Sequence, residues 1–441
     1  MRFLERRFQL AAHGTTVSTE IVAGVTTFLT MAYIIFVQPA VLSACGMDFG
    51  SVLVATCVST AAATLLMAFL ANYPIAVAPA MGHNFFFAFS VVVGMKVPWR
   101  VALGAVAVAG VAFVATAGIG LRERIITAIP ASLKEAIAAG IGLLIAVVGL
   151  QWAGIIVAAP GTLVTLGSLH TRPALLALGG VALTAILIVR RTSGAFLWGI
   201  LATAAAGWAL GLVRYHGVAA LPPSLAPTFL QLDVLGALKP GMAAVVFVFF
   251  FLALFDSVGT LVAVGSQAGL MRGGTLVRAR QALLADAIGT VVGAALGTST
   301  VTAYIESSAG VAAGGRTGLA SVVTAVLFLL ALFFNPLVSM VGGGVPVGET
   351  VLYPTIAAPL ILVGTMMIGG VRRIDWADPT EAIPAFLTIV IMPLAVSITE
   401  GVSFGVIAYA ILKLAAGRAR EAHPLIYVFA ALFLVRYIFL R

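Results

Sequence analysis

The sequence has very few charged residues and very few cysteines for its length. Only 9% of its 441 residues are charged, whereas 62% are hydrophobic, and the mean hydropathy is +1.16. This composition excludes a set of soluble domains, in which about 25% of residues are charged. The two cysteines, Cys45 and Cys57, have no metal-ligand spacing and do not indicate a structural disulfide. Residues 1–18 carry charges but no apolar core before a cleavage site, so we expect a cytoplasmic lead-in, not a signal peptide.

Long apolar segments are what the sequence does contain. Segments of roughly 17–22 residues recur along nearly the whole chain, and each is long enough to cross a ~30 Å hydrocarbon core. The 47 glycines suit close packing between membrane helices, because small residues let the backbones approach. The sequence therefore predicts an all-α polytopic membrane protein. Plain spans are expected at 19–40, 50–71, 99–120, 131–150, 173–190, 194–213, 240–263, 279–297, 319–340, 352–370, 381–397 and 400–416.

Two further segments, 72–95 and 298–315, are too short or too interrupted to be plain spans. Pro74 and Pro79 break helical hydrogen bonding in the first segment. Hydroxyl side chains favour extended backbone in the second, at Thr298, Ser299, Thr300 and Thr302. If each segment crosses once, the chain has about fourteen crossings.

Both interrupted segments are expected to continue into short helices, beginning near Met81 and Ile305. Helix starts expose free N–H groups and the positive end of a dipole, so two that face each other can bind a partly negative ligand. At the other end of the chain, the tail 423–441 carries Arg436 within an apolar run. We expect this tail to lie at the membrane interface or to add another crossing.

The net charge of +9 indicates membrane orientation, not nucleic-acid binding. With the N-terminus inside, seventeen of the 24 basic residues lie on the inner side. This is the distribution that the positive-inside rule describes. We therefore expect a cytoplasmic N-terminus in a plasma (inner) membrane. The inner residues are Arg2, Arg6, Arg7, Arg122, Arg124, Lys134, Arg190, Arg191, Arg272, Arg278, Arg280, Arg316, Arg372, Arg373, Lys413, Arg418 and Arg420.

The two halves of the chain resemble each other in layout. Residues 59–82 and 285–308 each contain a small-residue span, a break and a short stretch ending in small or polar residues. Two halves of seven crossings each are inverted in the membrane, because seven is odd. Inverted repeats whose broken elements meet at mid-membrane are typical of secondary transporters. The alternative is that helices rich in glycine and alanine look alike without being repeats.

Two carboxylates lie within apolar segments, Asp256 in FFFLALFDSVGTL (249–261) and Glu306 in TAYIESSAG (302–310). A charge near the centre of a membrane helix costs roughly 2.5–3.5 kcal/mol, so these residues indicate a polar site. Carboxylates can accept hydrogen bonds from the ring N–H and amino groups of a flat heterocycle. Removal from water also favours their protonated form, which makes both candidates for proton coupling. The structural alternatives are a carboxylate bonded to a neighbouring helix for Asp256 and a helix cap for Glu306.

Other polar residues are weaker candidates. Asp286 is expected to brace the broken segment or a loop, and Glu20 to lie at the membrane interface. His83 is either a ligand contact or a hydrogen bonder between helices, whereas Asn84 mirrors the Glu306 region.

Four stretches resemble the azaguanine-like purine permeases, a branch of the nucleobase–cation symporter superfamily. They are TEIVAGVTTFLTMAYIIFVQPA (19–40), NYPIAVAPAMGHNFFFAF (72–89), FFFLALFDSVGTL and TAYIESSAGVAAGGRTG (302–318). The resemblance implies fourteen spans in a seven-plus-seven inverted repeat. It also implies a core domain, 19–122 and 240–340, a gate domain, 131–216 and 350–417, and proton-coupled uptake of adenine, guanine or hypoxanthine.

The resemblance also implies site residues. Asp256 matches the family's eighth-span acidic position, which contacts the base, Glu306 matches the tenth-span carboxylate, and Asn84 matches the third-span asparagine. Together with the neighbouring residues of the two short helices, the expected substrate contacts are Asp256, Glu306, Asn84, Gly82, His83 and Ile305. Between the two carboxylates, we expect Glu306 to be the main proton-coupling residue and Asp256 the steadier anchor. Ala80, His83 and Phe85 stand where the family usually has Gly, Leu and Ala, which affects the choice of substrate.

Several alternatives stay open at this point. The same fold could carry xanthine, uric acid, a pyrimidine base or an anion. A channel would conduct substrate without concentrating it. An intramembrane enzyme is disfavoured, because no zinc-type His/Glu motif and no serine–lysine dyad is present. No cofactor other than the coupling proton is expected, and the expected partners are a purine base, the bilayer and a possible second copy of the chain.

Overall fold

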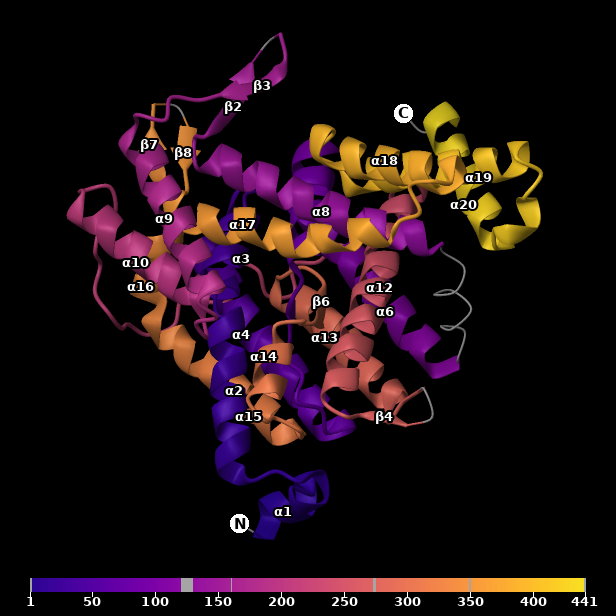
Figure 1. The fold of residues 1–441 in the computed structure, drawn as a ribbon. Coiled ribbons are helices and arrows are strands. Elements are labelled where there is room, and N and C mark those ends of the chain that lie inside the picture. The colour runs from indigo at the N-terminus through magenta and orange to yellow at the C-terminus, as the bar shows by residue number, and fades with distance from the viewer. Residues whose placement is uncertain (1, 120–129, 160, 273–274, 349, 440–441) are drawn as a thin grey trace.

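Membrane-length helices make up most of the computed structural model, which describes residues 2–119, 130–159, 161–272, 275–348 and 350–439 (Figure 1). Ten helical stretches in these ranges are long and apolar enough to cross a membrane. The helices of the first half are α2 (Val17–Met31), α3 (Ile34–Ser43), α4 (Phe49–Leu66), α6 (Trp99–Ile119), α8 (Ala131–Trp152), α9 (Arg172–Val189) and α10 (Ala195–Ala209). Those of the second half are α12 (Ala243–Gln267), α13 (Ala279–Leu296), α15 (Gly318–Ala331), α16 (Asn335–Gly342), α17 (Pro354–Met367), α18 (Pro379–Leu394) and α19 (Ile398–Ala415).

Short helices and hairpins complete the described chain. The short helices are α1 (Arg2–Phe8), α5 (Met81–Phe85), α11 (Val234–Ala237) and α14 (Ser307–Ala312), and the tail forms α20 (Pro424–Phe439). The hairpins pair β2 (Ile156–Ala159) with β3 (Leu163–Leu166), β4 (Met271–Arg272) with β5 (Thr275–Leu276), and β7 (Val345–Val347) with β8 (Thr350–Leu352). The sequence reading did not foresee these hairpins, because they lie in loops that carry no long alternating pattern.

One expected span, 319–340, is divided into α15 and α16. Pro336 has no N–H to bond the Leu332 carbonyl one turn earlier, so the helix cannot continue unchanged. The side-chain amide of Asn335 donates to that carbonyl at 3.1 Å instead. The division therefore leaves this carbonyl satisfied inside an apolar region.

The two interrupted segments meet as an antiparallel strand pair in the middle of the molecule. In β1 (Val77–Pro79) and β6 (Val301–Ala303), Ala78 lies opposite Thr302. All six strand residues are buried, and Figure 1 shows β6 surrounded by helices. Further backbone hydrogen bonds flank the pair, from the Ala80 N–H to the Thr300 carbonyl and from the Tyr304 N–H to the Ala76 carbonyl, each 2.9 Å long. Extended backbone can lie this deep because protein groups satisfy it.

Two threonines support the inverted repeat. Thr64 of α4 and Thr290 of α13 occupy the same position when residues 59–82 are aligned with 285–308. Thr64 Oγ1 donates to the Val77 carbonyl at 3.1 Å and accepts from the Val77 N–H at 3.0 Å. Thr290 Oγ1 donates to the Val301 carbonyl at 2.8 Å. The equivalent helices of the two halves, α4 and α13, thus each bond the strand that follows them, β1 and β6.

The helices pack in two groups. In one, α13 packs on α4 and α6, and α15 packs on α2 and α4. In the other, α8 packs on α17 and α18, and α18 on α19. The tail helix α20 packs on α19, while Phe429 in it contacts Phe247 of α12 with ring centroids 4.7 Å apart. The tail therefore touches both groups.

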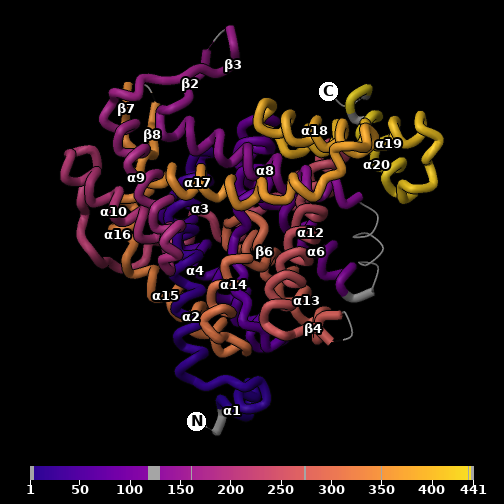
Figure 2. The backbone as a smooth tube through the Cα atoms, in the orientation of Figure 1, coloured from indigo at the N-terminus to yellow at the C-terminus, as the bar shows by residue number. Residues whose placement is uncertain are grey.

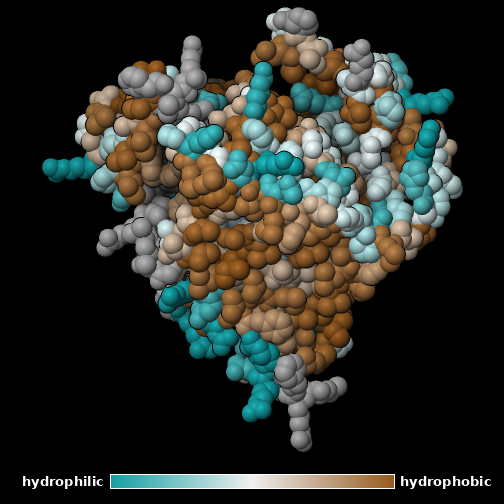
Figure 3. All heavy atoms as spheres, turned by 180° about the vertical axis from the view of Figure 1, so that it is seen from behind, coloured by the Kyte–Doolittle hydropathy of each residue, from teal (hydrophilic) through white to brown (hydrophobic). Residues whose placement is uncertain are grey.

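The surface is divided in the way a membrane requires. Seen from behind, the molecule has a broad continuous hydrophobic surface across its middle, and hydrophilic side chains gather toward its ends (Figure 3). At one end the hairpins β2–β3 and β7–β8 lie near each other (Figure 2), and the Tyr353 N–H after β8 donates to the Trp152 carbonyl before β2 at 2.8 Å. The prediction of a polytopic helical membrane protein is confirmed.

Candidate functional site

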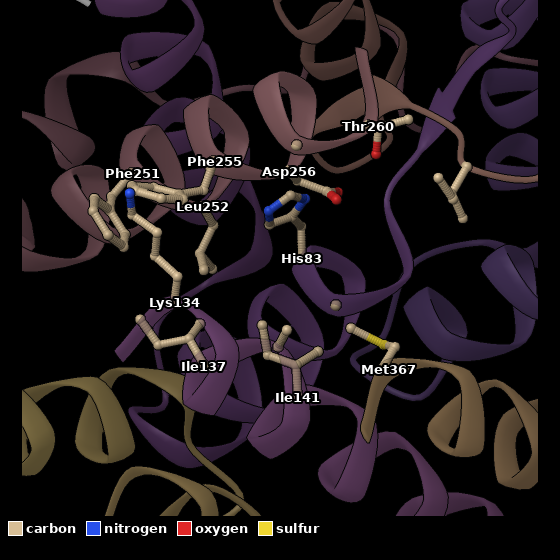
Figure 4. A pocket seen from close by; sticks show the side chains of 14 residues that line it. His83, Lys134, Ile137, Ile141, Phe251, Leu252, Phe255, Asp256, Thr260 and Met367 are labelled. Carbon is tan, nitrogen blue, oxygen red and sulfur yellow. The ribbon is translucent and has the colours of Figure 1, made fainter. Parts of the chain in front are cut away.

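A cavity of about 270 Å³ lies between the two groups of helices (Figure 4). Ligand pockets usually range from about 300 to 1,000 Å³, so this cavity suits a small molecule. Its walls come from α5, α8, α12 and α17 and from Ile305 in the turn before α14. The lining residues are Gly82, His83, Lys134, Ile137, Ala138, Ile141, Phe251, Leu252, Phe255, Asp256, Gly259, Thr260, Ile305 and Met367.

Asp256 lines the cavity from α12 and is accessible from it. Thr302 Oγ1 donates to Asp256 Oδ2 at 2.9 Å. Because Thr302 belongs to β6, the strand pair sets the position of this carboxylate. The Asp256 carboxylate thus lines the cavity, and its contact with substrate stays a prediction.

His83 and Gly82 line the cavity from α5. The His83 ring is buried, makes a hydrogen bond with the backbone of Leu252 in α12, and points toward the Asp256 carboxylate in Figure 4. His83 Nδ1 has no hydrogen-bond partner among the described residues. His83 thus bonds a neighbouring helix and lines the cavity, and its contact with a ligand stays a prediction. At Gly82 a Cβ atom would lie 2.7 Å from Ile141 Cγ2, so glycine allows α5 to approach α8 closely.

Ile305 lines the cavity, but the side chain of Glu306 is not among its lining residues. Tyr33 Oη, between α2 and α3, donates to Glu306 Oε1 at 2.7 Å. Glu306 immediately precedes α14, yet its side chain makes no capping hydrogen bond there. Helix α14 starts at Ser307, two residues later than predicted, because Ile305 and Glu306 form a turn.

Asn84 is fully buried and also lies outside the cavity lining. Its Oδ1 accepts a hydrogen bond from the Ser299 hydroxyl. Gln38 Nε2 donates to Thr298 Oγ1 at 2.8 Å and to Ser299 Oγ at 3.3 Å. Asn84 thus connects α5 to the segment before β6, and its contact with substrate stays a prediction.

Two other carboxylates are bound to the framework. Asp286 in α13 accepts from the Ser257 hydroxyl of α12, while its bracing of the broken segment or a loop stays a prediction. Glu20, expected at the membrane interface, has a side chain that is fully buried within the protein. It accepts from the backbone N–H groups of Arg316 at 2.8 Å and Ala320 at 3.2 Å. Glu20 therefore satisfies free donors at the start of α15.

Sequence reasoning missed Lys134, which it counted as a loop charge. Lys134 lies in the first turns of α8, and its Nζ is 5.1 Å from the centroid of the Phe255 ring. Helical spacing could have revealed it, because residues 134, 137, 138 and 141 share one face and all line the cavity. No group of three or more His, Cys, Asp and Glu side chains suitable for a metal ion occurs in the described ranges.

The buried strand pair, the carboxylate hydrogen-bonded to it through Thr302 and the small cavity are compatible with a site for a small ligand. A family model described as "Permease family" matches residues 18–404. The chain belongs to this permease family. It is therefore a membrane transporter, and the prediction that it is not an enzyme is confirmed.

Full-length relatives support this membership. A permease of Methanocaldococcus jannaschii is 50% identical over 442 residues, covering 100% of this chain and 99% of that protein. The guanine/hypoxanthine permease PbuG of Bacillus subtilis is 47% identical, covering 98% and 99%. The adenine permease AdeP of Escherichia coli is 44% identical, covering 99% and 96%. The resemblance to purine permeases inferred from the motifs is confirmed.

Solved structures with the same fold are also transporters. The transmembrane domain of the cyanobacterial bicarbonate transporter BicA aligns with a TM-score of 0.64 at 18% identity, over 87% of this permease and 96% of that chain. SLC26A9 aligns with a TM-score of 0.61 at 11% identity, over 91% and 66%. At such identities the likeness concerns the fold, and it agrees with the predicted seven-plus-seven inverted repeat.

Proposed function

We propose that this permease imports purine nucleobases together with protons across the plasma membrane, with its N-terminus in the cytoplasm. The observation that carries the proposal is the Asp256 carboxylate, which faces a cavity of about 270 Å³ whose other walls are mostly apolar. A flat heterocycle has apolar faces and N–H groups at its edge, and this cavity complements both. The purine permeases named above supply the substrate class.

Glu306 is proposed as the main proton-coupling residue. The Tyr33 hydroxyl that donates to Oε1 links this carboxyl group to the junction of α2 and α3. Ile305, the preceding residue, lines the cavity, so a bound base that contacts Ile305 can shift the backbone that carries the Glu306 carboxyl group. Protonation of Glu306 would then alter its bond with Tyr33 as the transporter changes conformation.

The core domain (19–122 and 240–340) and gate domain (131–216 and 350–417) are proposed to move relative to each other. The cavity wall includes residues of both, among them Asp256 from the core and Lys134 and Met367 from the gate. A site at such a boundary can open to alternate sides when one group of helices moves against the other. A homodimer is a further prediction, and it is independent of the cavity, which residues of one chain line.

Uptake measurements test the proposal. Radiolabelled guanine, hypoxanthine, adenine, xanthine and uracil are offered to a transport-deficient bacterium that expresses the permease, with and without an uncoupler. We expect purines to accumulate against their gradient and the accumulation to collapse with the uncoupler. Uptake that only equilibrates would indicate a channel, and uptake of uracil alone would overturn the purine assignment.

A further inference from the structure

Tyr33 lies at the break between α2 and α3 and makes contacts in two directions. Its hydroxyl donates to Glu306 Oε1 at 2.7 Å, and its ring packs on Phe196 of α10, with ring centroids 5.3 Å apart and planes at 50°. The side chain is buried. In the proposed division of the chain, Tyr33 and Glu306 belong to the core domain, whereas Phe196 belongs to the gate domain. One side chain therefore touches both the carboxyl group and a gate helix.

The segment that carries Glu306 is packed tightly on α2. A Cβ atom at Gly310 of α14 would collide with Thr27 Oγ1, so glycine there allows α14 to approach α2 closely. Thr30 Oγ1 of α2 also donates to the Glu306 carbonyl at 3.3 Å. Close packing of the two backbones thus holds the Glu306 carboxyl group opposite the Tyr33 hydroxyl.

Helices α2 and α10 meet beside the same break. A Cβ atom at Gly194, just before α10, would lie 3.1 Å from Leu29 Cβ of α2, and α10 itself packs on α17. At the break the Ile35 N–H donates to the Ala32 carbonyl at 3.1 Å, which is the three-residue spacing of a 3₁₀ turn. Such a turn within a longer helix often marks a hinge. The hinge position therefore coincides with Tyr33, the residue that contacts α10.

The strength of the Tyr33–Glu306 hydrogen bond depends on the state of the carboxyl group. A hydrogen bond to an ionised carboxylate is roughly twice as strong as one between neutral groups. The titratable groups close to Glu306 are Tyr33, Asp256 of α12 and Tyr304, the residue after β6. Tyr304 donates its hydroxyl to the Pro79 carbonyl at 2.5 Å. In the described ranges, the side-chain donor to Glu306 is therefore the Tyr33 hydroxyl.

We propose that Tyr33 is a positioning residue that transmits the protonation state of Glu306 to α10 through Phe196. When Glu306 is ionised, the tyrosine hydroxyl is held firmly and its ring stays against Phe196. When Glu306 is protonated, the bond weakens and α10 is released from the break between α2 and α3. This inference rests on the proposed proton-coupled transport and names the contact through which the proton acts on the gate domain.

Tyr33→Phe and Phe196→Leu test the two contacts separately. The first variant removes the hydroxyl and keeps the ring, and the second removes the ring contact and keeps an apolar side chain. Labelled hypoxanthine serves to measure the KM and maximal rate of net accumulation, the rate of counterflow exchange, and the amount of protein in the membrane is determined in parallel.

Net accumulation requires Glu306 to lose its proton in each cycle, whereas exchange of the loaded carrier proceeds with Glu306 protonated. In each variant we expect the maximal rate of accumulation to fall roughly tenfold or more, the loss typical of one hydrogen bond to a charged group, while KM and counterflow change less than about threefold. The double variant should lose no more than the more affected single variant, because both substitutions interrupt one route. Losses that multiply would show two independent effects and overturn the proposal.

Tyr427→Phe is the matched control, because the Tyr427 hydroxyl donates to the Ala419 carbonyl at 2.9 Å and Tyr427 is absent from the cavity wall. This control should leave accumulation and counterflow unchanged. In Tyr33→Phe, an equal loss of accumulation and counterflow would assign the tyrosine a structural role and overturn the proposal, as would a raised KM alone or unchanged accumulation. If the wild type accumulates purines but the variants behave in these ways, only this inference fails. If the wild type accumulates no purine, the proposed function fails and this inference fails with it.

Discussion

The two interrupted segments share a backbone plan and differ in chemistry. Both form a buried strand followed by a helix, and the strands pair around Ala78 and Thr302. The first segment, 72–95, contains no Asp or Glu, and its helix α5 continues as a π-helix over Phe86–Gly94. The second contains a run of hydroxyl residues and Glu306, and its helix α14 has only 6 residues.

This difference shows how a symmetric framework produces an asymmetric site. The first segment supplies Gly82 and His83 to the cavity wall, whereas the second holds Asp256 through Thr302 and places Glu306 beside Tyr33. The inverted repeat accounts for the antiparallel pairing of β1 with β6. The carboxylate chemistry belongs to one half alone, which suits a ligand whose two edges differ.

The largest expected effect concerns the carboxylates linked to the second segment. Asp256→Ala and Glu306→Ala should each abolish purine uptake, because losing one charged hydrogen-bond partner costs typically 1.5–3 kcal/mol or more. Initial uptake at low substrate is measured together with the amount of protein in the membrane. Thr302→Val, which removes only the supporting hydroxyl, should cause a smaller loss. Normal uptake by either alanine variant would remove that carboxylate from the site.

Glu306→Gln should separate binding from coupling. Glutamine keeps the size of the side chain and an acceptor for the Tyr33 hydroxyl but cannot exchange a proton near neutral pH. We expect this variant to exchange internal for external base yet fail to accumulate it. Counterflow and net accumulation, each with and without an uncoupler, provide the measurement. Accumulation that persists and is still sensitive to the uncoupler would move the proton-coupling role to Asp256 or another group.

The matched threonines allow a comparison of stability between the two halves. Thr64→Val should destabilise the protein more than Thr290→Val, because Thr64 makes two hydrogen bonds with the Val77 backbone and Thr290 makes one with Val301. Loss of the Thr64 hydroxyl leaves a buried N–H without that acceptor, which costs about 1–3 kcal/mol. Thermal unfolding of both purified variants in the same detergent tests the order. Equal shifts, or a larger shift for Thr290→Val, would contradict it.

The smallest expected effect is at His83 in the first segment. His83→Leu removes a polar ring that lines the cavity and replaces it with an apolar side chain. We expect the ratio of guanine to adenine uptake to shift a few-fold toward adenine, because a donor and acceptor near Asp256 is lost. The ratio is measured in parallel with total uptake of each base. A uniform loss for all bases would leave His83 with only its role of joining α5 to α12.

Much of the architecture follows from local properties of the chain. Apolar length predicts the membrane helices, and prolines and hydroxyl residues mark both interruptions. The rarity of carboxylates in apolar surroundings singles out Asp256 and Glu306, because the energetic cost of each is independent of fold details. The partners of Glu20 could not be predicted, since its position in the sequence does not reveal that it accepts hydrogen bonds from the backbone of residues 316–320.

The sequence by itself determined that the protein is a polytopic transporter with two broken segments and a pair of intramembrane carboxylates. Only the tertiary structure decided that Asp256 faces the cavity while Glu306 accepts a hydrogen bond from Tyr33. It also decided that Lys134, which the sequence places beside a loop, lies in the cavity wall. Membrane spans and their interruptions can be predicted from the sequence because hydropathy and helix breaking depend on neighbours along the chain. The composition of a site depends on which faces of distant helices border the same cavity, here those of α5, α8 and α12, and that is set by packing of the whole molecule.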